Sequence, residues 1–176
     1  DENTELVHFI GKDNIVFFCF TFPAILKATE QYILPENVPA NEFMNLQGDK
    51  ISTSRNWAVW LHEYLEEFPG KEDELRYTLM ANMPENKDSE FTWQDFQAKV
   101  NNELVANLGN FINRVVVLMH KYYQGVIPEI KQSQLNETDL QVLASIHISA
   151  EKIAQSIEHF KFRDALSAFN ELSSVG

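Results

Sequence analysis

One pattern of apolar residues limits the folds open to this chain more than any other feature. From Thr92 onward, apolar side chains recur in steps of three and four over about thirty residues. Steps of that kind place side chains on one face of an α-helix, so the pattern predicts a single long helix with a buried stripe. The stripe consists of Phe96, Val100, Leu104, Leu108, Phe111, Val115, Leu118 and Tyr122.

Two further helices are predicted after this one. Thr92 and Asp95 have roughly the spacing of a capping box, which marks the start of the first helix. The second helix is expected over residues 140–157 and the third over residues 162–172. Helices of this kind should pack antiparallel, so an all-α bundle is predicted. Core residues expected on the second helix are Ile146, Ile153 and Ile157.

The first ninety residues alternate between extended and helical patterns, which indicates a mixed α/β arrangement. Residues 84–91 form a polar connector, which we take as the boundary between a domain of residues 1–90 and one of residues 91–176. The chain as a whole is therefore expected to be mostly helical. The expected elements are strands at residues 5–10 and 38–46 and amphipathic helices at residues 57–68 and 73–83.

Residues 15–22 are apolar on nearly every face, so periodicity does not separate a buried helix from a buried strand. A capping Asp13 or Asn14 before the segment and Pro23 after it favour a buried helix with a bend or break. Such a segment needs a covering layer in water, and the residues before it supply little of one.

A polar stretch at residues 48–56 is the strongest candidate for chemistry. It contains Lys50, three hydroxyl side chains and Arg55 between an extended run and a helical pattern. Read locally, it is the tip of a hairpin followed by a helix N-cap. A loop of this composition also brings an ammonium group, hydroxyls and backbone N–H groups to a phosphate chain. Both interpretations stand on the residues alone.

Two other polar groups are candidate binding sites. Gly11 and Asp13 lie where a strand ends and a helix begins, which is the usual ligand position in an open α/β sheet. Asn110 and Arg114 lie one turn apart beside the apolar stripe, where an amide and a guanidinium can read an unstacked RNA base. The simpler local readings are a capped turn for the first pair and a solvated helix flank for the second.

Charge and composition limit the partners. The net charge is −12, whereas broad nucleic-acid binding needs a basic surface, so DNA binding is not expected and any RNA contact must be local. The single Cys19 excludes an intrachain disulfide and fits a reducing compartment. No apolar run is long enough for a membrane span, so a cytoplasmic protein is expected. His62 and Glu66 offer only two ligands, so no metal site is predicted.

Several motifs, in order, resemble the second half of the catalytic domain of methionyl-tRNA synthetases. They are Val7–Asp13, Asn41–Met44 and Lys50–Ser54, and the last resembles that family's mobile Lys-Met-Ser-Lys-Ser loop. The resemblance covers essentially the whole chain, and residues 102–114 resemble the start of the family's anticodon-binding bundle. It implies the remnant of a Rossmann-type catalytic domain followed by an all-α, truncated anticodon-binding bundle.

The resemblance implies roles for individual residues of the first domain. Lys50 and Thr53 would stabilise the departing pyrophosphate and contact ATP, with Thr53 standing where the family has a second Lys. Arg55 would help to supply the charge that is missing there. Gly11 and Asp13 would bind ATP, chiefly through its ribose. Phe18 stands where the family normally has a His that shapes the methionine pocket.

The resemblance also implies the partners. Asn110 and Arg114 fall on the anticodon-reading Asn and Arg, while the family's Trp beyond the third helix lies past the end of this chain. The parent protein would be an aminoacyl-tRNA ligase of protein biosynthesis that uses methionine, ATP with Mg²⁺, and tRNA(Met). The family's His-Ile-Gly-His motif and its zinc-bearing insertion would lie upstream, so this segment alone is expected to be inactive.

Two alternatives stay open. Phe18 and Thr53 depart from the family pattern, which favours a non-catalytic helical RNA-binding or protein-interaction module on the same scaffold. A sister synthetase for another amino acid is the third reading, because the loop alone does not exclude it.

Overall fold

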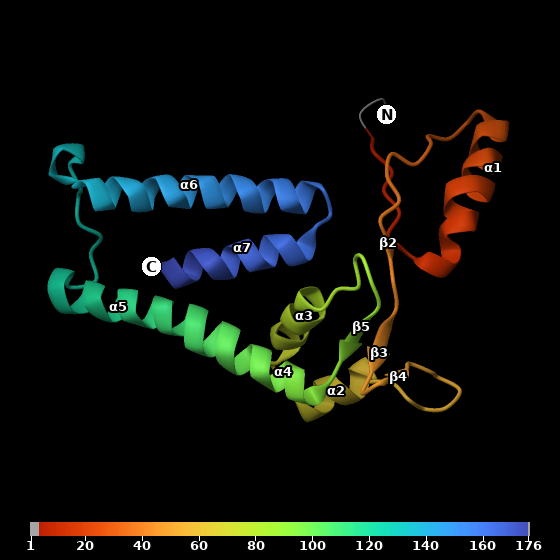
Figure 1. Cartoon of the computed structure of the whole chain (residues 1–176), viewed down its shortest axis with the longest axis horizontal. Helices are drawn as coiled ribbons and strands as arrows, with labels where there is room; N and C mark the ends of the chain where they lie inside the picture. The colour runs from red at the N-terminus through yellow and green to blue at the C-terminus, as the bar shows by residue number, and fades with distance from the viewer. Residues whose placement is uncertain (1–3, 176) are drawn as a thin grey trace. The chain divides into compact units, whose positions relative to one another are not determined.

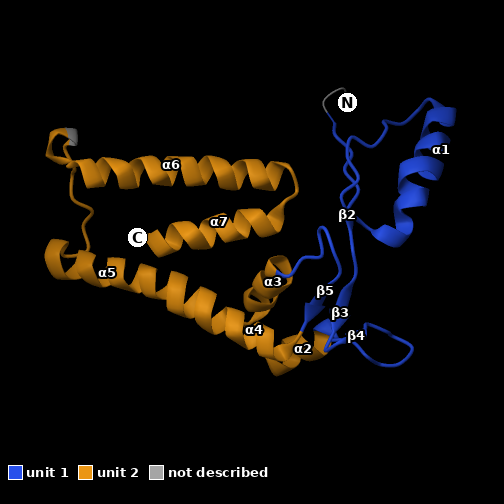
Figure 2. Ribbon diagram, in the orientation of Figure 1, with its two compact units in different colours: residues 1–61, 82–91 blue, residues 62–81, 92–176 orange. Residues whose placement is uncertain are grey.

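The computed structural model describes residues 4–175, apart from the side chain of Gln132. The chain forms two compact units that interleave in sequence (Figure 2). The first comprises residues 4–61 and 82–91, and the second comprises residues 62–81 and 92–175. The division of the chain into domains at residues 90 and 91 stays a prediction. The compact units differ from that division in one respect, because residues 62–81 pack with the second unit.

The first unit contains two small sheets (Figure 1). In one, β1 (Ile10–Gly11) pairs in parallel with β2 (Ala40–Asn41). In the other, β3 (Met44–Leu46) lies between the antiparallel β4 (Asp49–Lys50) and the parallel β5 (Ser89–Phe91). The predicted strand regions are confirmed, but regular pairing covers only parts of them. The connector prediction missed β5, because three residues are too few for an alternating pattern.

The apolar segment of the first unit is helical, as predicted. It runs through η1 (Lys12–Asn14), η2 (Phe17–Thr21) and α1 (Phe22–Thr29). The π-helical turns of η2 end at Thr21, one turn or less before Pro23, the residue that cannot donate a backbone hydrogen bond. The prediction that this helix is buried is wrong for the described residues: Phe20 is 70% exposed and Val16 is 69% exposed, because no layer of those residues covers them.

The regular elements described in the second unit are all helices. Its long helical path begins after Thr92, whose hydroxyl accepts from the Asp95 N–H at 3.0 Å, and it ends before Gln124 at a left-handed φ of 54°. One long helix was therefore predicted correctly. The elements are α2 (Leu61–Glu67), α3 (Glu72–Ala81), α4 (Trp93–Lys99), η3 (Val100–Gly109), α5 (Asn110–Tyr123), η4 (Gln132–Gln134), α6 (Glu137–Glu158) and α7 (Phe162–Val175).

Within this unit α6 and α7 form an antiparallel pair, and α7 also packs against α3 and η3 (Figure 1). Asn136 and Asp139 make a reciprocal capping box at the start of α6. The predicted buried stripe is wrong in its last third: Val115 is 44%, Leu118 51% and Tyr122 63% exposed. These side chains lie on α5, whereas α7 packs on η3. The core placement of Ile146 and Ile157 on α6 is also wrong, since both are over 40% exposed.

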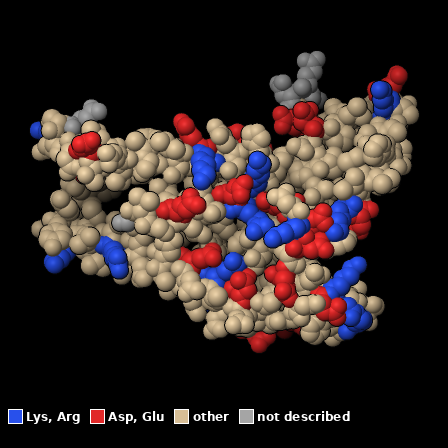
Figure 3. Space-filling model, viewed as in Figure 1, with Lys and Arg blue, Asp and Glu red and all other residues tan. Residues whose placement is uncertain are grey.

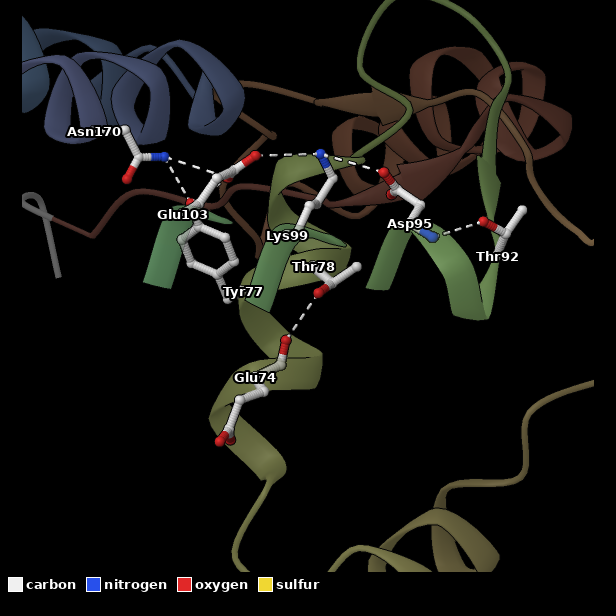
Figure 4. A network of polar contacts seen from close by, with 8 residues as sticks. All are labelled: Glu74, Tyr77, Thr78, Thr92, Asp95, Lys99, Glu103 and Asn170. Carbon is white, nitrogen blue, oxygen red and sulfur yellow. Dashed lines mark hydrogen bonds and ion pairs between the residues drawn. The ribbon is translucent and has the colours of Figure 1, made fainter. Parts of the chain in front are cut away.

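A network of polar side chains ties α3, α4, η3 and α7 together (Figure 4). The Tyr77 hydroxyl donates to the Glu103 carboxylate, and the Asn170 amide donates to the Tyr77 oxygen at 2.6 Å. The Lys99 ammonium lies 3.7 Å from both Asp95 and Glu103. Burial, followed by the hydrogen bond to Glu103, raises the pKa of Tyr77 to about 12.

Replacing Tyr77 by Phe should make the stability of this chain less sensitive to alkaline pH. A raised tyrosine pKa contributes stability that is present below pH 10 and is lost as pH rises from 10 to 12. We expect Tyr77→Phe to cost about 1–2 kcal/mol at pH 8, through lost hydrogen bonds. That difference should shrink toward pH 12. Urea unfolding at pH 8, 10 and 11.5 measures it, and a constant difference would contradict the assignment.

Candidate functional site

The polar stretch at residues 48–56 folds as a hairpin tip followed by a second, wider turn. Gln47 and Gly48 form the tip with positive φ values of 52° and 83°, which joins β3 to β4. A bridge between Ser52 and Trp57 then encloses the turn. The hairpin reading is confirmed. The helix cap directly after it is wrong, because Trp57 pairs with Ser52 and α2 begins only at Leu61.

The stretch is held in place by its own side chains. Arg55 donates to the Asp49 carboxylate and to the Lys50 carbonyl, both at 2.9 Å. The Arg55 hydrogen bond lowers the pKa of Asp49. At the far end the Trp57 indole donates to the Leu46 carbonyl at 3.0 Å. The Arg55 guanidinium therefore stabilises the loop through these hydrogen bonds, and the Lys50 ammonium takes no part in them.

Gly11 and Asp13 lie in one tight turn at the end of β1. A side-chain carbon added to Gly11 would stand 2.7 Å from an Asp13 carboxylate oxygen, so glycine leaves the space that this carboxylate occupies. Between them Lys12 pairs with Glu42 and, at 2.9 Å, with Asp88. These carboxylates raise the pKa of Lys12, the Glu42 hydrogen bond first. The turn thus presents the Asp13 carboxylate, while its Lys12 is bound to Glu42 and Asp88, which lie next to β2 and β5.

Replacing Gly11 by Ala should displace the Asp13 carboxylate. If Asp13 contacts ATP, we expect nucleotide binding to weaken about three- to tenfold, the value of one good hydrogen bond. Asp13→Ala and the double variant complete the cycle, measured as the Kd for ATP in a full-length protein of the family that the motifs resemble, with this chain in place of its matching segment. Because Gly11 acts through Asp13, the two effects should not add. Additive losses would show that Gly11 has a separate role.

The structure brings Lys50 and the Gly11–Asp13 turn to one aromatic ring. The Lys12 ammonium lies 4.5 Å and the Lys50 ammonium 5.1 Å from the centre of the Phe43 ring. Thr53 is exposed at the turn beyond, where its carbonyl accepts from the Asn56 N–H at 3.0 Å. Sequence reasoning missed Phe43 and Lys12 as site residues, although both stand inside the motifs that carry the resemblance.

Phe18 lies in an aromatic cluster rather than alone. Its ring is 5.0 Å from the His8 ring and 6.0 Å from the Phe22 ring, measured between centroids. The buried His8 Nε2 has no hydrogen-bond partner among residues 4–175. An imidazole therefore stands beside Phe18, and it belongs to His8, which lies inside the Val7–Asp13 motif.

Asn110 and Arg114 open α5 and share a face, as their spacing predicts. Both line a hollow of about 490 Å³, together with Asn107, Ser173 and Ser174. The Asn110 amide donates to the Ala106 carbonyl at 3.0 Å, which leaves its oxygen as the natural acceptor. Arg114 is exposed, and within the described part of the chain its guanidinium has no ion pair. A guanidinium and an amide therefore face one concave surface.

Asn107 joins the two walls of this hollow and was also missed. Its amide donates to the Asn170 carbonyl at 3.1 Å, while its oxygen accepts from Ser173 at 3.2 Å and from Ser174 at 3.3 Å. Only a side chain with both a donor and an acceptor makes this set of bonds. The available signal was the run of polar residues at positions 170, 173 and 174 on one face of α7.

The surface charge is mixed rather than basic. Figure 3 shows acidic and basic side chains interspersed on the visible face. Among the residues that the structure describes, no three His, Cys, Asp or Glu side chains gather as a metal site. None of the described helices is both long enough and apolar enough to cross a membrane.

Comparison with known proteins identifies the family. A family model described as tRNA synthetases class I (M) matches residues 1–116. The chain belongs to the methionyl-tRNA synthetase family. A methionine–tRNA ligase of Cytophaga hutchinsonii is 63% identical over 175 residues, which is 99% of this chain and 25% of that protein. One of Flavobacterium johnsoniae is 61% identical over 176 residues, 100% of this chain and 24% of that protein.

This chain thus spans about a quarter of the curated synthetases that it matches. Solved structures agree on the fold. Mycobacterium tuberculosis methionyl-tRNA synthetase bound by methionyl-adenylate superimposes with a TM-score of 0.83 at 24% identity, over 96% of this chain and 32% of that one. A second complex of that synthetase with methionyl-adenylate gives 0.78 at 25% identity, over 95% and 32%. The predicted class I catalytic remnant followed by a helical bundle is confirmed.

Proposed function

We propose that this chain is part of a methionine–tRNA ligase, which activates methionine with ATP and transfers it to tRNA(Met). The observation that carries the proposal is identity of about 60% to ligases of that name along the whole chain. In this reaction the methionine carboxylate attacks the α-phosphate and pyrophosphate leaves. The terminal hydroxyl of tRNA then takes the acyl group, and AMP leaves. Such a ligase works beside its tRNA, in the cytoplasm.

In the proposed enzyme the first unit serves the adenylation step. Lys50, the last residue of β4, places a positive charge against the departing pyrophosphate of the MgATP substrate, and the Thr53 hydroxyl on the following turn adds a hydrogen bond. Gly11 and Asp13 bind the nucleotide. Phe18, beside the His8 imidazole, forms part of the methionine pocket. The zinc-bearing insertion and the other catalytic motif of the family belong to the remaining three quarters of the ligase.

The second unit serves tRNA recognition in this proposal. The Asn110 and Arg114 side chains on one hollow suit an unstacked anticodon base, which offers ring faces for stacking and edges for hydrogen bonds. A net charge of −12 makes long-range attraction of RNA unfavourable, so recognition rests on directed contacts.

This chain by itself should not activate methionine. The proposed mechanism needs groups outside these residues, so methionine-dependent ATP–pyrophosphate exchange should stay at background. The same chain, substituted for the matching quarter of a full-length relative, should support exchange. Exchange by the isolated chain would contradict the division of labour, and an inactive but folded chimera would contradict the proposed function.

A second candidate is a non-catalytic RNA-binding or protein-interaction module on this scaffold. Phe18 in place of the expected His and Thr53 in place of the expected Lys favour it, since each removes a polar or charged group. The chimera separates the two: a module that only binds would retain tRNA binding and give no exchange.

A further inference from the structure

One aromatic ring in the first unit carries two lysine ammonium groups whose surroundings differ. Both Lys12 and Lys50 lie within the range of a cation–π contact to Phe43. Lys12 is also paired with Glu42 and Asp88, so its charge is compensated. Lys50 has no ion pair among residues 4–175, and the ring is the partner that the described structure provides for its ammonium.

The backbone of Phe43 is held by two hydrogen bonds, which limit where its ring can lie. The Phe43 N–H donates to the Asp88 carboxylate at 3.0 Å, and the Phe43 carbonyl accepts from the Ser89 N–H at 2.9 Å. The next residue opens β3, in which Asn45 stands opposite Lys50 of β4. Side chains alternate along a strand, so Phe43 and Asn45 share a face, and Lys50 reaches the ring as a diagonal neighbour.

We infer that Phe43 is a positioning residue for Lys50. Its ring holds Lys50 beside the Gly11–Asp13 turn before substrate binds. When ATP binds, the Lys50 ammonium leaves the ring and contacts the phosphate groups. This inference rests on the phosphate role proposed for Lys50. The physical basis is a contact of intermediate strength: an exposed cation–π pair biases the side chain by about two- to fivefold. A charged phosphate attracts the ammonium more strongly and therefore displaces it from the ring.

The aromatic face, rather than apolar bulk, is what the inference requires. Leucine would preserve much of the packing but has no ring quadrupole, whereas tyrosine preserves the face. Phe43→Leu should therefore release Lys50, and Phe43→Tyr should retain it. Phe20→Leu is the matched control, since that exposed ring belongs to the same unit and has no lysine over it in the described structure.

Nuclear magnetic resonance of the chain with labelled lysine tests the contact directly. The Lys50 signal is identified by its absence in Lys50→Gln. Its side-chain protons should be shifted upfield by the ring in the native chain, in Phe43→Tyr and in Phe20→Leu, and should lose that shift in Phe43→Leu. Inorganic pyrophosphate should remove the shift in the native chain and should bind about two- to fivefold more weakly to Phe43→Leu. An unchanged Lys50 signal in Phe43→Leu would overturn the inference.

Kinetics of a full-length ligase that carries this chain separate this inference from the proposed function. Phe43→Leu should lower kcat for ATP–pyrophosphate exchange about two- to fivefold with the KM for methionine unchanged, and Phe43→Tyr should restore it. If Lys50→Gln has no effect on exchange, the proposed role of Lys50 fails whatever the spectra show. If Lys50→Gln abolishes exchange while Phe43→Leu equals the native protein, only the positioning role fails.

Discussion

Replacing Lys50 by Gln in a full-length ligase that carries this chain should lower kcat for ATP–pyrophosphate exchange by about 10²–10³-fold. Negative charge grows on the leaving pyrophosphate, so a cation there stabilises the transition state more than bound ATP. Thr53 stands where a second cation is expected, and Arg55 is engaged with Asp49, so in the proposed mechanism Lys50 carries most of this stabilisation. The KM for methionine should change little.

Lys87→Gln is the matched control for this experiment. Lys87 is an exposed lysine of the same unit and lies outside the proposed site. Its replacement by Gln removes the same charge from the chain as Lys50→Gln does. It should leave exchange unchanged. A loss below about fivefold for Lys50→Gln would mean that the loop does not serve the leaving group. A gain in activity for Thr53→Lys would further support the reading of the loop, since it adds the expected second cation.

If Asn110 and Arg114 read the anticodon as proposed, replacing Arg114 by Ala should remove the preference for a CAU anticodon that the proposal predicts. We expect the ratio of Kd values for a CAU stem-loop and a scrambled one to fall by about tenfold or more, because a planar guanidinium that pairs with a base is worth about 1–3 kcal/mol. The measurement is a titration of native and variant chains with both hairpins at several salt concentrations.

Arg76→Ala serves as the control for the anticodon experiment. Arg76 is exposed on α3 and pairs with Asp73, so its loss removes the same charge from the same unit. It should leave the preference unchanged. Equal, salt-sensitive binding of both hairpins by the native chain would mean contact with phosphates alone. An unaltered preference in Arg114→Ala would place the reading group elsewhere on the hollow, for which Asn110→Ala is the next variant.

The parts of the site that sequence predicted are those that lie close together along the chain. Asn110 and Arg114 were paired because four residues make about one helical turn, and both do line one hollow. A hairpin tip was predicted within residues 48–56, and the structure places it at Gln47 and Gly48, where Gly48 adopts the positive φ that glycine favours. The Asn107 bridge, by contrast, joins residues more than sixty positions apart, so the polar face of α7 gave a local signal for a contact but did not indicate its partner.

The burial of side chains was predicted less well than the helices themselves. The periodicity of the stripe predicted a helix correctly, yet it placed Val115, Leu118 and Tyr122 in a core that the described residues do not form. An apolar period shows which face of a helix needs a partner, whereas the position of the partner depends on the packing of the other helices.

The sequence by itself determined the helices of this protein, the tip of the hairpin and the family to which its motifs belong. Helical hydrogen bonds join residues four apart, so composition and period over short windows encode them. Only the tertiary structure decided that β5 pairs with β3, that Lys12 reaches Asp88 and that two lysines share the Phe43 ring. Apart from the contact of Lys50 with Phe43, which lies within one hairpin, these contacts close loops of about thirty to eighty residues. Packing of the whole chain, rather than any local preference, selects them.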